Sequence, residues 1–173
     1  FSPLHVILLE LIMGPTCSII YENEPAEANI MQKEPRRSSA NFFNIKELIT
    51  SVLQGVMITV GLVFAYQWAV NNEWNENVTR SMVFLTLIVS NIVLTLVNRS
   101  FYYSLWTTLR YKNILVPSII GITIFLTVLL FAIPFLRSLF TFELLTFSQL
   151  AFCVTVGSVA VWWFEAVKYF RRM

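Results

Sequence analysis

Residues 8–31, with the sequence LLELIMGPTCSIIYENEPAEANIM, pass from an apolar run into a polar stretch. The apolar run contains one carboxylate, Glu10, followed by Gly14 and Pro15. A glycine-proline pair is typical of a break in a helix. If the run crosses a bilayer, the charge and the break both lie where they are unfavourable, which is the arrangement expected of a binding site.

The composition indicates that the chain does cross a bilayer. Of its 173 residues, 57% are hydrophobic and 13% are charged. A soluble domain has about 25% charged residues, so this chain has too few charges to cover a surface that faces water. The net charge of +2 argues against electrostatic capture of nucleic acid, and we expect no nucleic-acid partner. The sequence has no aspartate, and its single histidine and two separated cysteines lack the spacing of a metal site.

Four apolar segments are close to the roughly 20 residues that a helix needs to cross the hydrocarbon core. They are residues 45–68, 81–98, 114–136 and 149–169. A fifth segment, residues 4–21, is interrupted by Glu10 and by Gly14-Pro15. We therefore predict an all-α polytopic membrane protein with five transmembrane helices, the first of which is broken at Gly14-Pro15.

The segments divide the chain into three parts. We expect a broken transmembrane helix with ion-site residues at 1–21, a cytoplasmic loop at 22–44, and a four-helix transmembrane scaffold at 45–173. The aromatic and basic residues 101–111 are compatible with a short helix on the membrane surface or with a structured loop, and both interpretations are open.

The distribution of lysine and arginine predicts the orientation. If residues 22–44 are cytoplasmic, alternation places only Arg80 and Arg137 on the outer side. The other basic residues then lie inside: Lys33, Arg36, Arg37, Lys46, Arg99, Arg110, Lys112, Lys168, Arg171 and Arg172. Because cytoplasmic loops retain positive charge, we predict a multi-pass protein of the cell membrane with a cytoplasmic C-terminus.

The environment of Glu10 has two interpretations. Pro15 has no N–H, so the carbonyl of Leu11 loses its helical donor, and Gly14 loosens the local backbone. Freed carbonyls beside a carboxylate form an oxygen-rich site that suits a hard cation or a proton. The alternative is a simple kink, with Glu10 near the outer interface and paired to a lysine of another helix. The amide of Asn91 in the middle of a span is similarly compatible with ion coordination or with a hydrogen bond to a neighbouring helix.

Three motifs resemble a known family. ENEPAEANIM at residues 22–31, followed by KEPRR at 33–37, resembles the end of the sixth transmembrane helix and the next loop of type II P-type cation-transporting ATPases, such as calcium and sodium pumps. FLTLIVSNIVLTLVNRS at residues 84–100 resembles the eighth helix of these pumps, and FEAVKYFRR at 164–172 resembles their basic tail. The resemblance covers essentially the whole chain and implies that it forms helices six to ten of such a pump.

The resemblance also implies a set of ligands for the transported cation. Glu10 falls where calcium pumps carry an asparagine ligand, Gly14 falls where they carry an aspartate, and Asn91 falls where they carry a glutamate or glutamine. Glu10 and Asn91 are therefore the expected ligands, together with backbone near Leu11 and Gly14. Met13 and Gly14 replace polar ligands, which argues against calcium and makes a site for a monovalent ion or a proton credible unless the remaining helices add charge; the identity of the ion stays open.

The remaining implications concern partners. ATP and Mg²⁺ are expected in the parent pump and not in this fragment, because the phosphorylated aspartate and the nucleotide-binding domain of the family precede the segment that it resembles. The implied partners are the transported cation, the lipid bilayer, and the remaining helices and cytoplasmic domains of the pump. The alternative is a self-contained small membrane protein, either a binding scaffold or a secondary transporter subunit.

Overall fold

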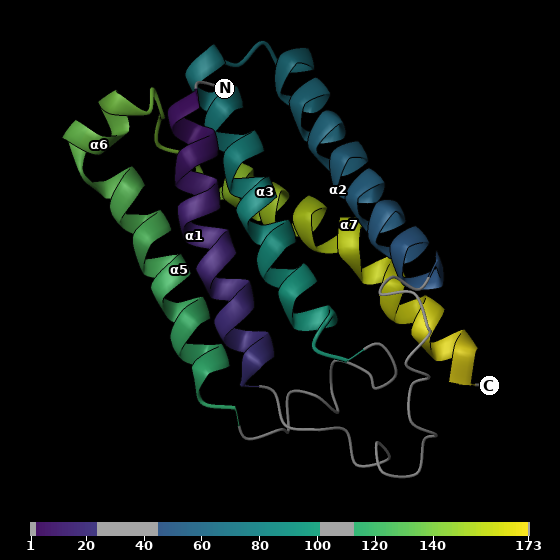
Figure 1. Cartoon of the computed structure of the whole chain (residues 1–173). Coiled ribbons are helices and arrows are strands. Elements are labelled where there is room, and N and C mark those ends of the chain that lie inside the picture. The colour runs from purple at the N-terminus through teal and green to yellow at the C-terminus, as the bar shows by residue number, and fades with distance from the viewer. Residues whose placement is uncertain (1–2, 24–44, 101–112, 173) are drawn as a thin grey trace.

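The computed structural model describes residues 3–23, 45–100 and 113–172 (Figure 1). In these ranges all regular structure is helical: α1 (Pro3–Glu22), α2 (Ile45–Asn71), α3 (Glu76–Val97), α5 (Leu115–Ala132), α6 (Pro134–Leu139) and α7 (Phe147–Arg172). Five of these helices, all except α6, are long and apolar enough to cross a membrane. The predicted all-α fold with five spans is confirmed.

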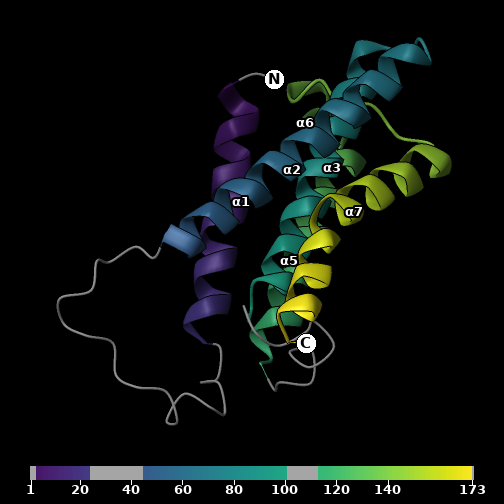
Figure 2. The same cartoon turned by 90° about the vertical axis from the view of Figure 1, so that its right-hand side faces the viewer.

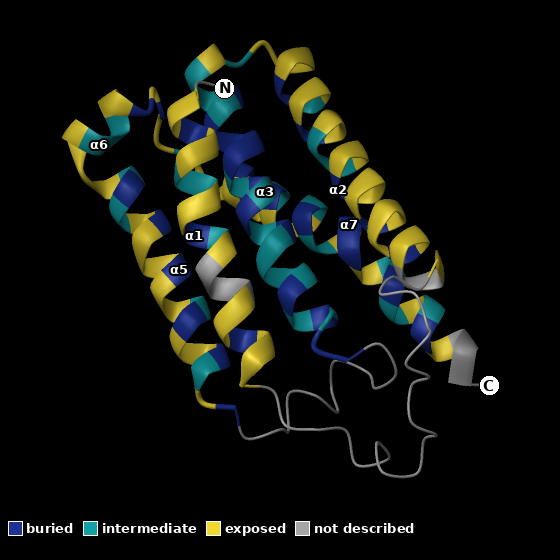
Figure 3. Ribbon diagram, viewed as in Figure 1, coloured by how far each residue is buried: buried dark blue, intermediate teal, exposed yellow. Residues whose placement is uncertain are grey.

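The helices form a bundle around α3. The start of α1, the short helix α6 and the α2–α3 connection lie at one end, which we call the α6 end (Figures 1 and 2). The last turns of α3 and α7 and the start of α5 lie at the opposite end (Figures 1 and 2). Helix α3 contacts α7, α2 and α1, and α5 contacts α1. Accordingly, α3 is the most buried span, whereas α2 and α5 expose long apolar faces (Figure 3).

The predicted break in the first helix is wrong. Helix α1 is continuous from Pro3 to Glu22 and passes through Gly14 and Pro15 without interruption. A proline removes one backbone donor, but its fixed φ is close to helical, and membrane helices tolerate it when their neighbours hold the backbone. Here Ile12 and Ile20, which flank the proline, are both buried against the bundle and keep the two halves in line.

A different proline ends a helix. The apolar segment 114–136 is not one continuous helix, because α5 ends at Ala132 and α6 begins at Pro134. Between them Ile133 is extended, with φ −82° and ψ 117°. The residue before a proline avoids the helical region, and proline is favoured at the first position of a helix. The chain therefore turns at this point.

Two regions on which predictions were made lie outside the described residues. One is the aromatic and basic segment 101–111, and the other is nearly all of residues 22–44 with their motif. The division of the chain at residues 21 and 44 stays a prediction.

Helices α3 and α7 approach each other closely at Gly157. A Cβ atom on Gly157 would lie 2.9 Å from the carbonyl oxygen of Thr86 and 3.0 Å from the Cβ of Val89. The hydroxyl of Ser90 donates a hydrogen bond to the carbonyl of Gly157, with an oxygen–oxygen distance of 3.2 Å. Small residues at the contact let the two backbones approach, which is how helices associate in a bilayer.

The polar side chains along α3 are satisfied mainly by their own helix. Thr86, Ser90, Asn91 and Thr95 each donate to the carbonyl four residues earlier, at distances of 2.8–3.0 Å. These bonds satisfy polar donors within the span, and the single hydroxyl hydrogen of Ser90 is shared between the carbonyls of Thr86 and Gly157.

Lys168 of α7 lies against the end of α3. Its ammonium group donates to the carbonyl of Val97 and lies 2.8 Å from a carboxylate oxygen of Glu165. Although it is a lysine, the residue is only 2% exposed. The Val97 carbonyl belongs to the last turn of α3, where carbonyls lack helical donors and a positive charge is favourable.

We predict that Gly157→Ala destabilises the fold by about 1–3 kcal/mol, because the new methyl group would overlap the backbone of α3. Gly121→Ala is the matched control, since nothing lies within 4 Å of its added Cβ. Alanine is also the better helix former, so this control should be neutral or stabilising. Thermal unfolding of the purified protein in detergent measures both variants. Equal midpoints for the two would contradict the close contact.

We also predict that Lys168→Met lowers the free energy of unfolding by about 1–3 kcal/mol. The change removes the donor to a buried carbonyl and leaves Glu165 without its cation. Glu165→Gln keeps an acceptor for the ammonium group and should lose less. The same unfolding assay decides, and a loss for Glu165→Gln as large as that for Lys168→Met would rule out the contact with Val97 as the main effect.

Candidate functional site

Glu10 lies on the exposed face of α1. The face toward α3 and α5 carries residues that are buried or half-buried: His5, Leu8, Leu9, Ile12, Met13 and Ile20. The other face carries Val6, Ile7, Glu10, Leu11 and Gly14, all of which are exposed (Figure 3). Among the described residues, no hydrogen bond or ion pair reaches the carboxylate of Glu10. A carboxylate near the middle of a span therefore has no partner among the described residues.

The backbone beside Glu10 is open. Pro15 has no N–H, so the carbonyl of Leu11 cannot receive the hydrogen bond that a helix would supply at that position. An added Cβ at Gly14 would meet no atom within 4 Å, so that turn of α1 has free space beside it. The carboxylate of Glu10, the Leu11 carbonyl without its helical donor, and the open space beside Gly14 thus occur within five residues of one helix.

Met13 has a different role from Glu10 and Gly14. It packs against the apolar cluster formed by Phe84, Ile88, Leu130, Phe140 and Phe142. Packing is the role expected of a thioether, which is a poor ligand for a hard cation.

Asn91 of α3 is half-buried. Its amide nitrogen donates to the carbonyl of Leu87 at 3.0 Å, whereas no donor within the described part of the chain reaches its amide oxygen. The hydrogen bond to a neighbouring helix is made by the adjacent Ser90, which reaches Gly157. No hydrogen bond joins Asn91 to Glu10, so the described residues contain two separate oxygen donors and not a closed site.

Three other carboxylates of the described residues differ from Glu10 in having polar partners. Glu76 forms an ion pair with Arg80, and Glu165 forms one with Lys168. Glu143 accepts a hydrogen bond from Asn75 at 3.3 Å. Within residues 3–23, 45–100 and 113–172, no group of three or more His, Cys, Asp or Glu side chains is gathered as a metal site would require.

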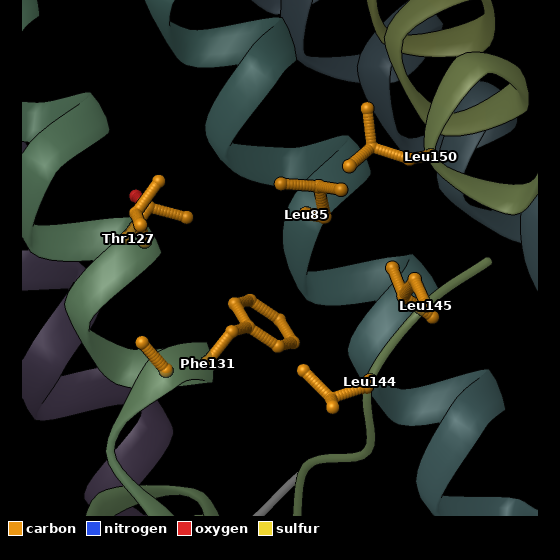
Figure 4. Close-up of a pocket in the computed structure, with 8 residues that line it drawn as sticks. Leu85, Thr127, Phe131, Leu144, Leu145 and Leu150 are labelled. Atoms are coloured by element: carbon orange, nitrogen blue, oxygen red, sulfur yellow. The ribbon is translucent and has the colours of Figure 1, made fainter. Parts of the chain in front are cut away.

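Two cavities of the described bundle are apolar. One, of about 260 Å³, lies between α3, α5, α7 and the segment that precedes α7 (Figure 4). Its walls are Leu85, Thr127, Val128, Phe131, Ala132, Leu144, Leu145 and Leu150. The hydroxyl of Thr127 donates to the carbonyl of Thr123 at 2.8 Å, so the walls offer little polarity to an ion. A second cavity of about 310 Å³, between α2 and α7, is also apolar.

Sequence reasoning missed the position of His5. Because the sequence has only one histidine, it argues against a metal site or a catalytic triad at His5 and predicts no other role for this residue. It is in fact 2% exposed and belongs to the buried face of α1. The available signal was its spacing of seven residues before Ile12, which places both side chains on one face of a helix.

Comparison with known proteins agrees with this arrangement. A family model described as the C-terminus of cation-transporting ATPases matches residues 1–170. No curated protein matches the chain. The family match covers nearly every residue, and the structure supplies the apolar spans that a membrane part requires. The chain therefore belongs to the family of cation-transporting ATPases and is a membrane part of such a pump, corresponding to its C-terminal region.

Proposed function

We propose that this chain supplies part of the ion-binding site of an ATP-driven cation pump, with Glu10 as its principal ligand and Asn91 as a secondary one. The observation that carries the proposal is the carboxylate of Glu10, near the middle of α1 and without a partner among the described residues. Backbone near Leu11 and Gly14 would share the coordination.

The energetics of the bilayer support this role. A carboxylate in the middle of a membrane helix is unfavourable by about 2.5–3.5 kcal/mol on insertion scales unless it is paired, protonated or bound to an ion. The face that carries Glu10 also exposes Ile7 at 64% and Leu11 at 70%. In the proposal, further helices of the pump cover this face and close the site around Glu10.

The choice of ion follows from the side chains near Glu10. Met13 and Gly14 contribute no side-chain oxygen, so this helix offers a single carboxylate. One negative charge balances a monovalent ion or a proton, whereas Ca²⁺ prefers six to eight oxygens with several carboxylates among them. We therefore propose a monovalent cation or a proton as the transported species.

The proposed orientation places the α6 end outside the cell and the C-terminus in the cytoplasm. Arg80 and Arg137 are the basic residues of the described α6 end, whereas Arg99 and Lys168 lie at the opposite end. The sequence adds five basic residues through the segments 24–44 and 101–112, which connect to helix ends on that second side. Such an excess is typical of the cytoplasmic side.

ATP and Mg²⁺ would act on other domains of the parent protein. The upstream gene sequence tests this assignment against the alternative of a self-contained small membrane protein. An Asp-Lys-Thr-Gly-Thr motif in the same reading frame before Phe1 would support the assignment to a pump. A start codon directly before Phe1 would contradict this assignment.

We predict that Glu10→Gln lowers the apparent affinity of the full-length pump for its cation about tenfold or more, equivalent to ~1.4 kcal/mol. The amide keeps the size of the side chain and removes its charge. Ion-stimulated ATP hydrolysis and uptake are measured in vesicles, with Na⁺, K⁺, Ca²⁺ and pH varied in turn. Glu143→Gln is the matched control, because this carboxylate lies outside the spans and its amide can still accept from Asn75. Unchanged affinity in Glu10→Gln would make Glu10 structural.

We predict a smaller loss of affinity for Asn91→Ala than for Glu10→Gln. An amide oxygen carries only a partial charge, and the amide nitrogen already bonds to the carbonyl of Leu87. The same transport assay compares the two variants. Ser90→Ala separates helix packing from ion binding, since Ser90 contacts Gly157. If Asn91→Ala and Ser90→Ala shift the affinity equally, Asn91 acts through packing.

A further inference from the structure

The histidine of α1 is enclosed by aromatic rings. His5 makes edge contacts with Phe84, Phe140 and Phe142, with distances between ring centroids of 6.2, 5.6 and 5.1 Å. The residue is 2% exposed. The rings keep water from its Nε2 atom, so a hydrogen bond made there faces no competition from solvent.

That hydrogen bond joins two distant parts of the chain. The Nε2 atom of His5 lies 2.9 Å from the carbonyl oxygen of Phe140, which is 135 residues away in sequence. A carbonyl oxygen can only accept, so Nε2 carries the proton and donates it. The contact attaches the start of α1 to the segment between α6 and α7.

The segment that accepts this bond is itself held on α3. The N–H of Glu143 donates to the hydroxyl of Ser81 at 2.8 Å. The guanidinium of Arg80 donates to the carbonyl of Thr141 at 3.4 Å and also contacts its hydroxyl. Because Ser81 and Arg80 both belong to α3, His5 is bonded to a point that is fixed on the central helix.

The other end of α1 has a similar attachment. The amide of Asn113 donates to the carbonyl of Ile20 at 3.4 Å, and its oxygen accepts from the N–H of Leu115 at the start of α5. Between these two attachments lie Glu10 and Pro15. The side chain of Glu10 points to the exposed face, whereas His5 points into the bundle.

The spacing of His5 and Glu10 makes the two residues mechanically linked. Five residues of α-helix separate them by about 7.5 Å along the axis and about 140° around it. Pro15 has no N–H, so the hydrogen bond from residue 15 to the carbonyl of Leu11 is missing. This gap lies on the C-terminal side of both His5 and Glu10. A displacement of His5 is therefore carried to Glu10 through an intact stretch of helix.

We propose that His5 is a positioning residue of the ion site: its hydrogen bond to the Phe140 carbonyl sets the depth and rotation at which α1 presents Glu10. This inference rests on the proposed function of Glu10. His5 does not contact the cation, and it acts through the position of α1 relative to α3.

The experiment uses the full-length pump in vesicles and the cation that stimulates ATP hydrolysis by the unmodified pump, chosen from Na⁺, K⁺, Ca²⁺ and protons. His5→Leu keeps an apolar side chain in the aromatic enclosure and removes the donor. We expect the half-saturating cation concentration to rise about threefold or more, with maximal turnover changed less. His5→Gln, whose amide N–H replaces the donor at Nε2, should retain the affinity of the unmodified pump.

Phe142→Leu is the control for a merely structural role. It removes one ring from the enclosure but leaves the Phe140 carbonyl in place, so it should lower the thermal midpoint and leave the affinity unchanged. The inference is overturned if His5→Leu has normal affinity, or if all three variants shift the affinity equally. If His5→Leu does not assemble, His5→Asn replaces it, because its shorter amide cannot reach the carbonyl. Equal affinities for the Asn and Gln variants then overturn the inference.

Glu10→Gln separates this inference from the proposed function. If Glu10→Gln alone leaves the affinity unchanged, the assignment of the ligand fails and positioning through Glu10 fails with it. If Glu10→Gln weakens binding and His5→Leu does not, only the positioning role fails. If Glu10→Gln and His5→Leu each weaken cation binding, the double variant that carries both changes should bind the cation no more weakly than Glu10→Gln alone.

Discussion

The rest of the bundle depends on the close contact between α3 and α7 at Gly157. Inside a bilayer the lipid tails are as apolar as the side chains, so apolar burial gives little reason for two helices to associate. Backbone contact and hydrogen bonds must supply it instead. Gly157 allows the backbone of α7 to contact that of α3 at Thr86, and Ser90 adds a hydrogen bond across this contact. The ammonium group of Lys168 donates a hydrogen bond to the last turn of α3.

Helix α2 joins this pair through a reciprocal pair of amides. Gln54 donates to the amide oxygen of Asn98 at 2.9 Å, and Asn98 donates back at 3.2 Å. Gly61 of α2 lies equally close to α7, since an added Cβ would be 3.0 Å from that of Ala160. These three helices form a block joined by close contacts and hydrogen bonds. Helix α1 packs against one side of this block, and one face of α1 is exposed (Figure 3). A helix bonded near its start to a segment that is fixed on such a block is suited to carry an ion ligand.

Much of this fold could be predicted from the sequence, because span length and hydropathy are properties of single segments. The two prolines show where such prediction stops. Pro134 ends α5, whereas Pro15 lies within an uninterrupted α1. Proline chemistry is the same in both, and the difference lies in what holds the flanking residues. Ile12 and Ile20 are fixed by other helices, which no local pattern reveals. Contacts between helices also limit the prediction of the site. The sequence indicated Glu10 and Asn91 as candidate ligands. It could not show that Ser90 makes the interhelical hydrogen bond or that His5 bonds to the carbonyl of Phe140.

The satisfaction of the other polar groups is what gives Glu10 its significance. Ser90, Thr86 and Thr95 bond to backbone carbonyls, and Lys168 neutralises Glu165 within its own helix. These residues have partners within the described structure, although the buried indole N–H of Trp163 has none. The carboxylate of Glu10 departs from this pattern although it lies on a span of comparable hydropathy. In our proposal its partner comes from outside the described helices. In our proposal that partner is the transported cation, held jointly with the helices that complete the pump.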